Sequence, residues 1–153
     1  MKWLELRVPP PLVGGTVALL MWLGATLVPG AQFPLPAKGP LAVALTAIGL
    51  CLGLVAYFQF RAAETTVHPM KPQESSALVV RGIYRLTRNP MYLGMLIILA
   101  AWAVWLANAV AFVLLPLFVV YLNRFQIAPE ERALETRFGT AFADYARAVR
   151  RWL

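Results

Sequence analysis

Three long stretches without a charged residue dominate this sequence, at residues 8–37, 39–60 and 89–123. A helix needs about 20 apolar residues to cross a bilayer, so each stretch is long enough for one. Only 14% of the residues are charged, whereas a soluble domain is nearer one quarter charged. We therefore expect an all-α integral membrane protein of one domain, residues 1–153, with two transmembrane helices in residues 1–60.

The third stretch is too long for one straight crossing. As a single helix, residues 89–123 would extend about 52 Å, but the hydrocarbon core of a bilayer is about 30 Å thick. We expect the chain to fold back at residues 106–109, where Asn108 is the most polar residue, so that residues 91–125 form a helical hairpin. The first arm, residues 91–105, extends only roughly 22 Å, which leaves open whether the hairpin crosses the whole bilayer.

The last segment, residues 126–153, has the pattern of an amphipathic helix. Large apolar residues recur every three or four positions and form one stripe, which contains Leu134, Phe138, Phe142, Tyr145, Val149 and Trp152. Such a helix lies in the membrane surface or covers the bundle. Pro129 is the expected start of this helix, and Gly139 is the position at which it could divide in two.

The basic residues predict how the chain is oriented. Eleven of the fourteen lie in residues 61–88 and 124–151, and cytoplasmic segments carry the excess of Lys and Arg. We therefore expect both termini and both basic segments on the cytoplasmic side. Basic juxtamembrane segments attract anionic headgroups, so the +7 charge indicates the bilayer as partner and not nucleic acid. The oligomeric state is left open.

No metal site is expected. Cys51 and His68 are the only residues of their types, and neither has the Cys or His companions of a metal site at the usual spacing.

Two polar clusters flank the predicted hairpin. The first contains Arg81, Tyr84, Arg88, Asn89 and Tyr92, and the second contains Arg124, Glu130, Glu131 and Arg132. A hairpin sets its two ends side by side, so we expect the clusters to form one pocket. Cations, backbone donors and a carboxylate pair suit a zwitterion with a ribose and an aromatic base. The competing interpretation, that arginines and tyrosines only anchor the chain at the interface, suits the separate arginines better than it suits the clusters.

Several motifs together resemble the isoprenylcysteine carboxyl methyltransferase family, in its bacterial branch, and the related phospholipid methyltransferases. They are Gly82-Ile83-Tyr84, the run from Arg88 to Gly94, the run from Glu130 to Leu134, and Phe138-Gly139. Residues 66–69, which include His68, and residues 76–79 are similar to the bacterial branch. Asn89 stands where the eukaryotic enzymes tend to have His. The resemblance covers residues 65–153. It implies a cofactor loop at residues 61–90, an active site on the cytoplasmic side and a location in a bacterial inner membrane.

The resemblance implies a membrane methyltransferase that uses S-adenosyl-L-methionine and releases S-adenosyl-L-homocysteine. The methyl acceptor would be small or lipophilic: an isoprenylcysteine-like carboxylate, a thiol or a lipid amine. The cofactor would be bound by His68, Leu78, Val79, Gly82, Tyr84, Arg88, Asn89, Pro90, Tyr92, Gly94, Glu130 and Glu131. The implied catalytic residues are Arg88, Tyr92, Glu131 and Arg124. Which of Glu130 and Glu131 contacts the cofactor stays open.

For Gly94, a second interpretation is close helix packing, since small residues let membrane helices approach each other. An apolar acceptor is expected to reach the pocket from the lipid, between the second span and the hairpin. Two other functions stay open. One is a membrane reductase of related architecture, although no G-x-G-x-x-G follows a strand. The other is a non-catalytic helical membrane protein.

Overall fold

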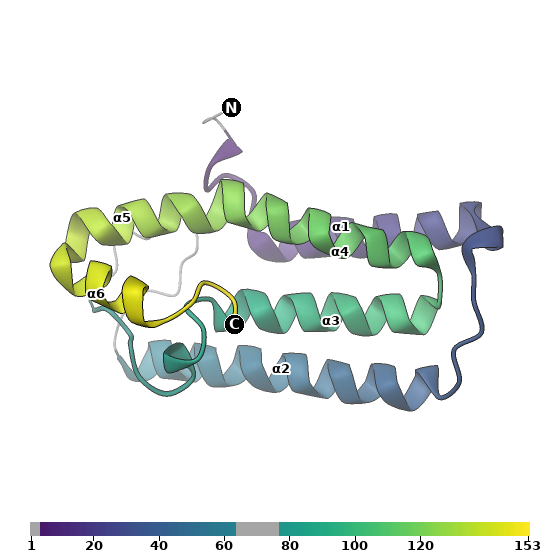
Figure 1. The fold of residues 1–153 in the computed structure, drawn as a ribbon, viewed down its shortest axis with the longest axis horizontal. Coiled ribbons are helices and arrows are strands. Elements are labelled where there is room, and N and C mark those ends of the chain that lie inside the picture. Colours follow the sequence, from purple (N-terminus) through teal and green to yellow (C-terminus); the bar gives the residue numbers. More distant parts are fainter. Residues whose placement is uncertain (1–3, 64–76) are drawn as a thin grey trace.

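The structure is a computed structural model that describes residues 4–63 and 77–153, and Figure 1 shows that these ranges are built of helices. The elements, in chain order, are α1 (Pro10–Leu27), the 3-10 turn η2 (Pro29–Ala31), α2 (Lys38–Ala62), the 3-10 turn η4 (Gly82–Arg85), α3 (Pro90–Leu106), α4 (Ala109–Leu122), the π-helical turn η5 (Asn123–Ile127), α5 (Ala128–Phe138) and α6 (Thr140–Ala148).

Within residues 4–63 and 77–153, three helices are long and apolar enough to cross a membrane. They are α1, α2 and the helix Ala109–Phe138, in which α4, η5 and α5 follow one another without a break. The other apolar helix, α3, has 17 residues, or about 26 Å. The predicted all-α membrane bundle, with two N-terminal spans followed by a hairpin, is confirmed.

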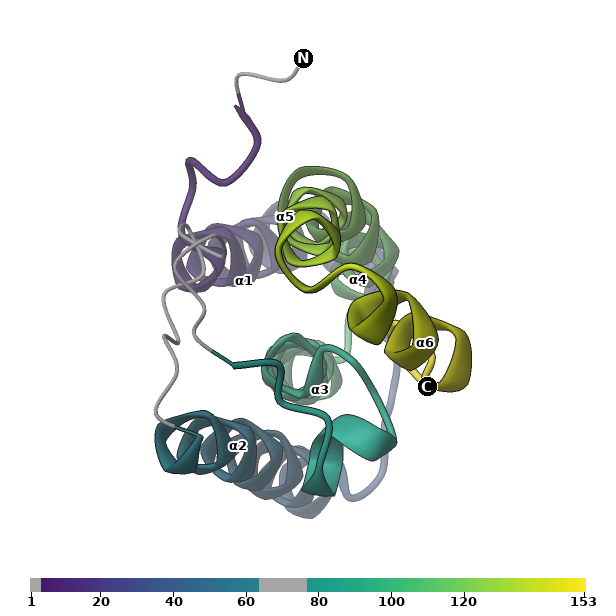
Figure 2. The same ribbon diagram turned by 90° about the vertical axis from the view of Figure 1, so that its left-hand side faces the viewer.

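The centre of the bundle is α3. Figure 2 shows α2 on one side of it and α1 with α4 on the other, and α3 contacts all three helices. Gly49 on α2 faces Gly94 on α3, and a Cβ added to either glycine would lie 2.6 Å from the carbonyl oxygen of the other. Small residues allow this close approach, so α2 is held mainly by its contact with α3.

The hairpin turns where the sequence predicts. Ala107 adopts the left-handed conformation with φ 47°, and the fully buried Asn108 follows it. The Asn108 side chain accepts a hydrogen bond from the Val110 amide at 2.9 Å and donates one to the Val28 carbonyl at 2.9 Å. One polar residue therefore caps α4 and ties the turn to the end of α1.

The C-terminal helix differs from the prediction at its start. No new helix begins at Pro129, because the chain continues from α4 through η5, where the Ala128 amide donates to the Asn123 carbonyl in a π-type bond. Proline lacks an N–H and its ring crowds the preceding turn, so a wide π turn lets the helix continue past it. The predicted division at Gly139 is confirmed, with φ 53° between α5 and α6.

Candidate functional site

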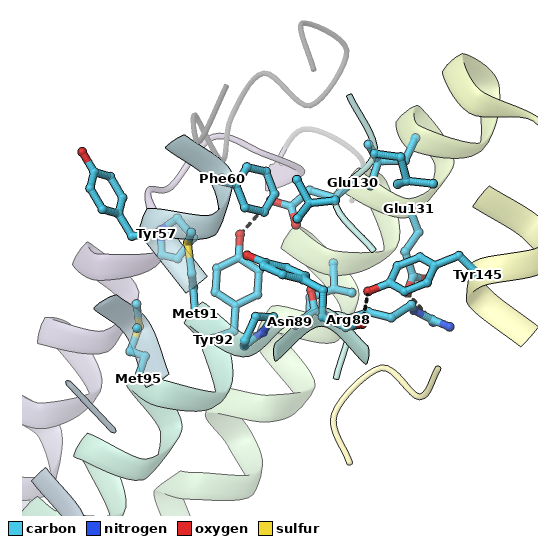
Figure 3. A pocket seen from close by; sticks show the side chains of 18 of the residues that line it. Tyr57, Phe60, Arg88, Asn89, Met91, Tyr92, Met95, Glu130, Glu131 and Tyr145 are labelled. Atoms are coloured by element: carbon cyan, nitrogen blue, oxygen red, sulfur yellow. Dashed lines mark hydrogen bonds and ion pairs between the residues drawn. The ribbon is translucent and has the colours of Figure 1, made fainter. Parts of the chain in front are cut away.

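A cavity of about 470 Å³ lies at the end of the bundle where α3 and α5 both begin. The volume is in the range of small-molecule sites, roughly 300–1,000 Å³. Its walls come from α1, α2, residues 77–79, η4, residues 88–89, α3, η5, α5 and α6, and Figure 3 shows most of the side chains that line it. The two ends of the hairpin therefore meet at one site, as expected from the sequence.

Nine of the residues predicted to bind a cofactor line this cavity: Leu78, Val79, Tyr84, Arg88, Asn89, Pro90, Tyr92, Glu130 and Glu131. Aromatic and apolar side chains complete the wall, among them Tyr57, Phe60, Phe142 and Tyr145. His68 lies outside the described residues.

Three predicted residues are not in the cavity wall. Gly82 has φ +59°, and a Cβ there would meet the side chain of Gln59. Gly94 lies in the close contact between α3 and α2, which agrees with the second interpretation of that residue, close helix packing. Arg124 pairs with Glu5 at 2.7 Å and is half exposed. All three contribute to packing or to the surface, and the structure does not bring them to the other site residues.

Glu130 lines the cavity, and only one of its two carboxylate oxygens accepts hydrogen bonds from other described side chains. The hydroxyl of Tyr92 donates to its Oε1 at 2.7 Å, and the amide of Gln126 donates to the same oxygen at 2.5 Å. Its Oε2 accepts no hydrogen bond from the described residues. Figure 3 shows the Tyr92 hydroxyl directed at the acid. Glu130 can therefore accept a hydrogen bond from a ligand without giving up either internal donor.

Gln126 was not among the residues singled out from the sequence. It is 2% exposed and lies in the π turn, four residues before Glu130. Residues four apart share a helix face, so a polar residue at that spacing from the acid was the available signal.

Glu131 has a different environment from its neighbour. It accepts hydrogen bonds from Arg88 Nη2 at 2.7 Å and from Arg151, whose Nε lies 3.1 Å away. Arg88 Nη1 also donates to the carbonyls of Ala146 at 2.6 Å and Val149 at 2.8 Å. A planar guanidinium suits such simultaneous contacts, so Arg88 and Glu131 together bind the C-terminal end of α6.

The residues on either side of Arg88 strengthen this attachment. Thr87 Oγ1 donates to the Arg151 carbonyl at 3.2 Å, and Asn89 Nδ2 donates to the same oxygen at 2.9 Å. Trp152 Nε1 donates to Asn123 Oδ1 at 3.0 Å. The last residues of the chain are therefore tied to both ends of the hairpin.

The end of the bundle is covered by α6. Phe142 is buried, and the Tyr145 hydroxyl donates to the Tyr84 carbonyl at 2.7 Å. Burial raises the pKa of Tyr145 to about 12 and raises the pKa of Tyr84 as well, so both hydroxyls stay protonated at neutral pH. The apolar stripe predicted for this segment thus faces the cavity through Leu134, Phe142 and Tyr145, so this part of the chain covers the end of the bundle.

The groups that line the cavity suit a partly cationic, aromatic ligand. A carboxylate oxygen attracts an ammonium or a hydroxyl group, and aromatic faces stack on a heterocycle or face a cation. Among residues 4–63 and 77–153, no three His, Cys, Asp or Glu side chains are grouped to hold a metal ion.

The fold defines a helical membrane protein, and the cavity is its candidate ligand site. The sequence matches the phospholipid methyltransferase family over residues 38–141, and the chain belongs to this family. An uncharacterized protein of Haemophilus influenzae is 48% identical over 63 residues, which are 41% of this chain and all of that protein. Protein-S-isoprenylcysteine O-methyltransferase A of Arabidopsis thaliana is 39% identical over 80 residues.

The plant match covers 50% of this chain but only 39% of the plant protein. No solved structure matches the chain. The resemblance recognised in the sequence is confirmed, and the family and the plant relative together point to a membrane methyltransferase.

Proposed function

We propose that this chain transfers a methyl group from S-adenosyl-L-methionine, bound in the cavity, to a small or lipophilic acceptor. The proposal rests on the environment of Glu130, which lines an aromatic cavity. Its Oε1 accepts hydrogen bonds from Tyr92 and Gln126, and its Oε2 is available to a ligand. The match to the phospholipid methyltransferase family supports a methyl group as the group that is transferred.

The residues of the cavity fit this cofactor. Glu130 Oε2 is an acceptor for a ribose hydroxyl or for the ammonium of the amino-acid end. Phe60 and Tyr84, whose rings meet edge to face at 5.2 Å, offer aromatic surface to the adenine. When bound, the cofactor supplies a methyl group that the positive sulfur already activates.

What the protein must add is alignment and the exclusion of water. We assign alignment of the cofactor to Glu130, which Tyr92 and Gln126 hold. We assign the exclusion of water to Phe142 and Tyr145 of α6. In this assignment Arg88 and Glu131 are positioning residues, because their contacts hold α6 over the cavity, and Arg124 has no catalytic role.

The nature of the acceptor decides whether a base is needed. A carboxylate attacks without losing a proton, whereas a thiol or an amine must be deprotonated. Tyr92 and Glu130 are the groups of the cavity that could relay that proton. We place the cavity on the cytoplasmic side, since the exposed arginines 81, 85, 132, 137 and 147 surround this end of the bundle.

Calorimetry on the detergent-purified protein tests the cofactor. S-adenosyl-L-homocysteine should bind and NADPH should not. Glu130→Gln should weaken binding by about 1.5–3 kcal/mol, or roughly 10–100-fold, since a hydrogen bond to a charged group is lost. Glu135→Gln is the matched control, because Glu135 is exposed and lies five residues further along α5.

Two results would contradict this proposal: binding of NADPH, as a reductase requires, or no binding of either compound by protein that is folded. The acceptor is then found by incubating the protein with methyl-labelled S-adenosyl-L-methionine and a membrane lipid or prenylthiol extract. Mass analysis of the labelled product identifies the methylated atom.

A further inference from the structure

The segment that precedes α1 lies against the helix that continues from α4 to α5, and Figure 1 shows the two side by side. We call this segment, residues 4–9, the N-terminal strap. The Leu6 amide donates to the Phe125 carbonyl at 3.0 Å, and Val8 packs against the core. Because Phe125 is the neighbour of Gln126 in η5, the strap is attached beside a residue that supports the candidate site.

A proline explains why the Phe125 carbonyl accepts a donor from the strap. In a regular helix this carbonyl would accept from the amide four residues later, but residue 129 is Pro and has no N–H. Backbone carbonyls away from water need a donor, and the Leu6 amide supplies one where Pro129 cannot. The strap therefore completes the hydrogen bonding of the π turn.

The conformation of Leu6 indicates that the strap is held in place. Its φ is 56°, in the left-handed region that a residue with a side chain rarely adopts. Such a conformation persists only where the surrounding contacts impose it. The contacts of the strap therefore outweigh the local preference of its backbone.

Glu5 supplies the strongest of these contacts. Its Oε1 accepts from Arg124 Nη1 at 2.7 Å, and its Oε2 accepts from Arg132 Nη2. The Glu5 side chain is only 14% exposed, so water screens this pair of bonds less than it screens an ion pair on the open surface. One carboxylate thus bridges η5 and α5, and both Gln126 and Glu130 lie between its two partners in the sequence.

The bridged region determines which acid is directed at Tyr92. A π turn contains one residue more than a regular turn, which rotates α5 relative to α4 by about 100°. Glu130 and Glu131 are adjacent and also point about 100° apart. The register of η5 therefore decides that Glu130, and not Glu131, meets Tyr92 and Gln126.

The strap also joins two walls of the candidate site. Pro10 and Pro11, at the start of α1, line the cavity, and so does Ile127 of η5. The strap runs directly into α1 and is bound to η5, so it holds these walls next to each other. Glu5 itself does not line the cavity, and its influence on a ligand is indirect.

We propose that Glu5 is a positioning residue for the candidate site. It fastens the N-terminal strap over η5, and the strap holds Gln126 and Glu130 in the register that presents Glu130 to the ligand. The identity of that ligand rests on the proposed function. In this proposal Arg124, which the family resemblance implied to be catalytic, serves the site as an anchor for Glu5.

Glu5→Gln tests this role on the full chain in detergent. The substitution keeps the shape of the side chain but removes the charge that binds both arginines. We expect the affinity for S-adenosyl-L-homocysteine, measured by calorimetry, to fall roughly 3–10-fold, since charge-assisted hydrogen bonds are weakened. Arg132→Gln, at an exposed end of the bridge, should act in the same direction but less. Wild-type affinity in both variants would overturn the proposal.

Asp144→Asn is the matched control. It removes the charge from an exposed ion pair with Arg147 on α6, and Asp144 does not line the cavity. Its affinity should equal that of the wild type. A loss as large as that in Glu5→Gln would overturn the proposal, because any ion pair of the surface would then have the same effect.

A double variant distinguishes positioning from general stabilisation. If Glu5 acts through η5 and Gln126, then Glu5→Gln should reduce the affinity less in a Gln126→Leu background than in the wild type, whereas independent effects add. The losses in melting temperature are the internal comparison, and both substitutions should lower it. Equal losses of affinity in the two backgrounds would overturn the positioning role.

Hydrogen exchange in the ligand-free protein separates this proposal from the proposed function. The amides of residues 124–132 should exchange faster in Glu5→Gln than in the wild type, and Asp144→Asn should show wild-type rates there. Unchanged exchange in Glu5→Gln would overturn the hold of the strap on η5, even in a protein that binds S-adenosyl-L-homocysteine. Faster exchange in a protein that does not bind it supports the strap and counts against methyl transfer.

Discussion

The hydroxyl of Tyr92, in the first turn of α3, lies 2.7 Å from Oε1 of Glu130, in the first turn of α5. The two residues are 38 positions apart, and they meet because the uncharged stretch between them folds back on itself. The polar pair thus joins the start of the first arm of the hairpin to the helix that continues its second arm.

Replacing Tyr92 by Phe removes one of the two donors to Glu130 and leaves the ring in place. Hydrogen bonds to charged groups contribute about 1.5 kcal/mol or more, so affinity for S-adenosyl-L-homocysteine should fall roughly tenfold. Calorimetry measures this directly. Tyr121→Phe is the control, since Tyr121 does not line the cavity. Equal affinities of the two variants would show that the tyrosine hydroxyl does not orient the acid.

Gln126→Leu removes the second side chain that donates a hydrogen bond to Glu130. Gln126 lies on the same continuous helix as Glu130. Gln126 is 2% exposed and does not line the cavity, so its effect on a ligand is indirect and passes through the side chains that it contacts, which include Glu130 and Tyr92. We expect weaker binding of S-adenosyl-L-homocysteine than in the wild type, and a loss of stability of about 1 kcal/mol from the buried hydrogen bond. Thermal unfolding and calorimetry on one preparation give both values. A stability loss with unchanged affinity would make Gln126 a packing residue only.

The length of the uncharged stretch and the place of Asn108 were sufficient to predict the hairpin and its turn. The sequence did not distinguish the environments of Glu130 and Glu131. Adjacent residues on a helix point about 100° apart, and the neighbouring sequence does not indicate which of the two carboxylates faces the cavity. The distinction comes from Arg88 and Arg151, which reach Glu131 from other parts of the chain.

Arg124 shows a second limit of the sequence. It precedes Glu131 by seven residues, a spacing that puts two residues on one face of a regular helix. The π turn between them includes an additional residue, which rotates the two halves of the helix relative to each other. Arg124 consequently turns to Glu5 while Glu131 faces Arg88.

Arg88→Lys should be a severe substitution although it conserves the charge. The guanidinium bonds to the Ala146 and Val149 carbonyls and to Glu131 at once, and an ammonium cannot match that planar arrangement. Loss of two of these bonds costs about 2 kcal/mol and loosens α6. Hydrogen exchange should therefore speed up in residues 140–152. Arg147→Lys, at an exposed pair with Asp144, should leave exchange as in the wild type, and equal protection in both variants would refute the role of Arg88.

The left-handed turn at Gly82 gives the last prediction. With φ +59°, any L-residue costs roughly 1–2 kcal/mol there. A Cβ would also displace the Gln59 side chain, which accepts a hydrogen bond from the Ile83 amide at 3.2 Å. Gly82→Ala should therefore lower the free energy of unfolding by about 2 kcal/mol and the melting temperature by roughly 4–8 °C. Gly15→Ala, in open space on a regular helix, should keep or slightly raise the melting temperature. An unchanged melting temperature in Gly82→Ala would show that η4 does not need the left-handed conformation to bring Tyr84 into the cavity.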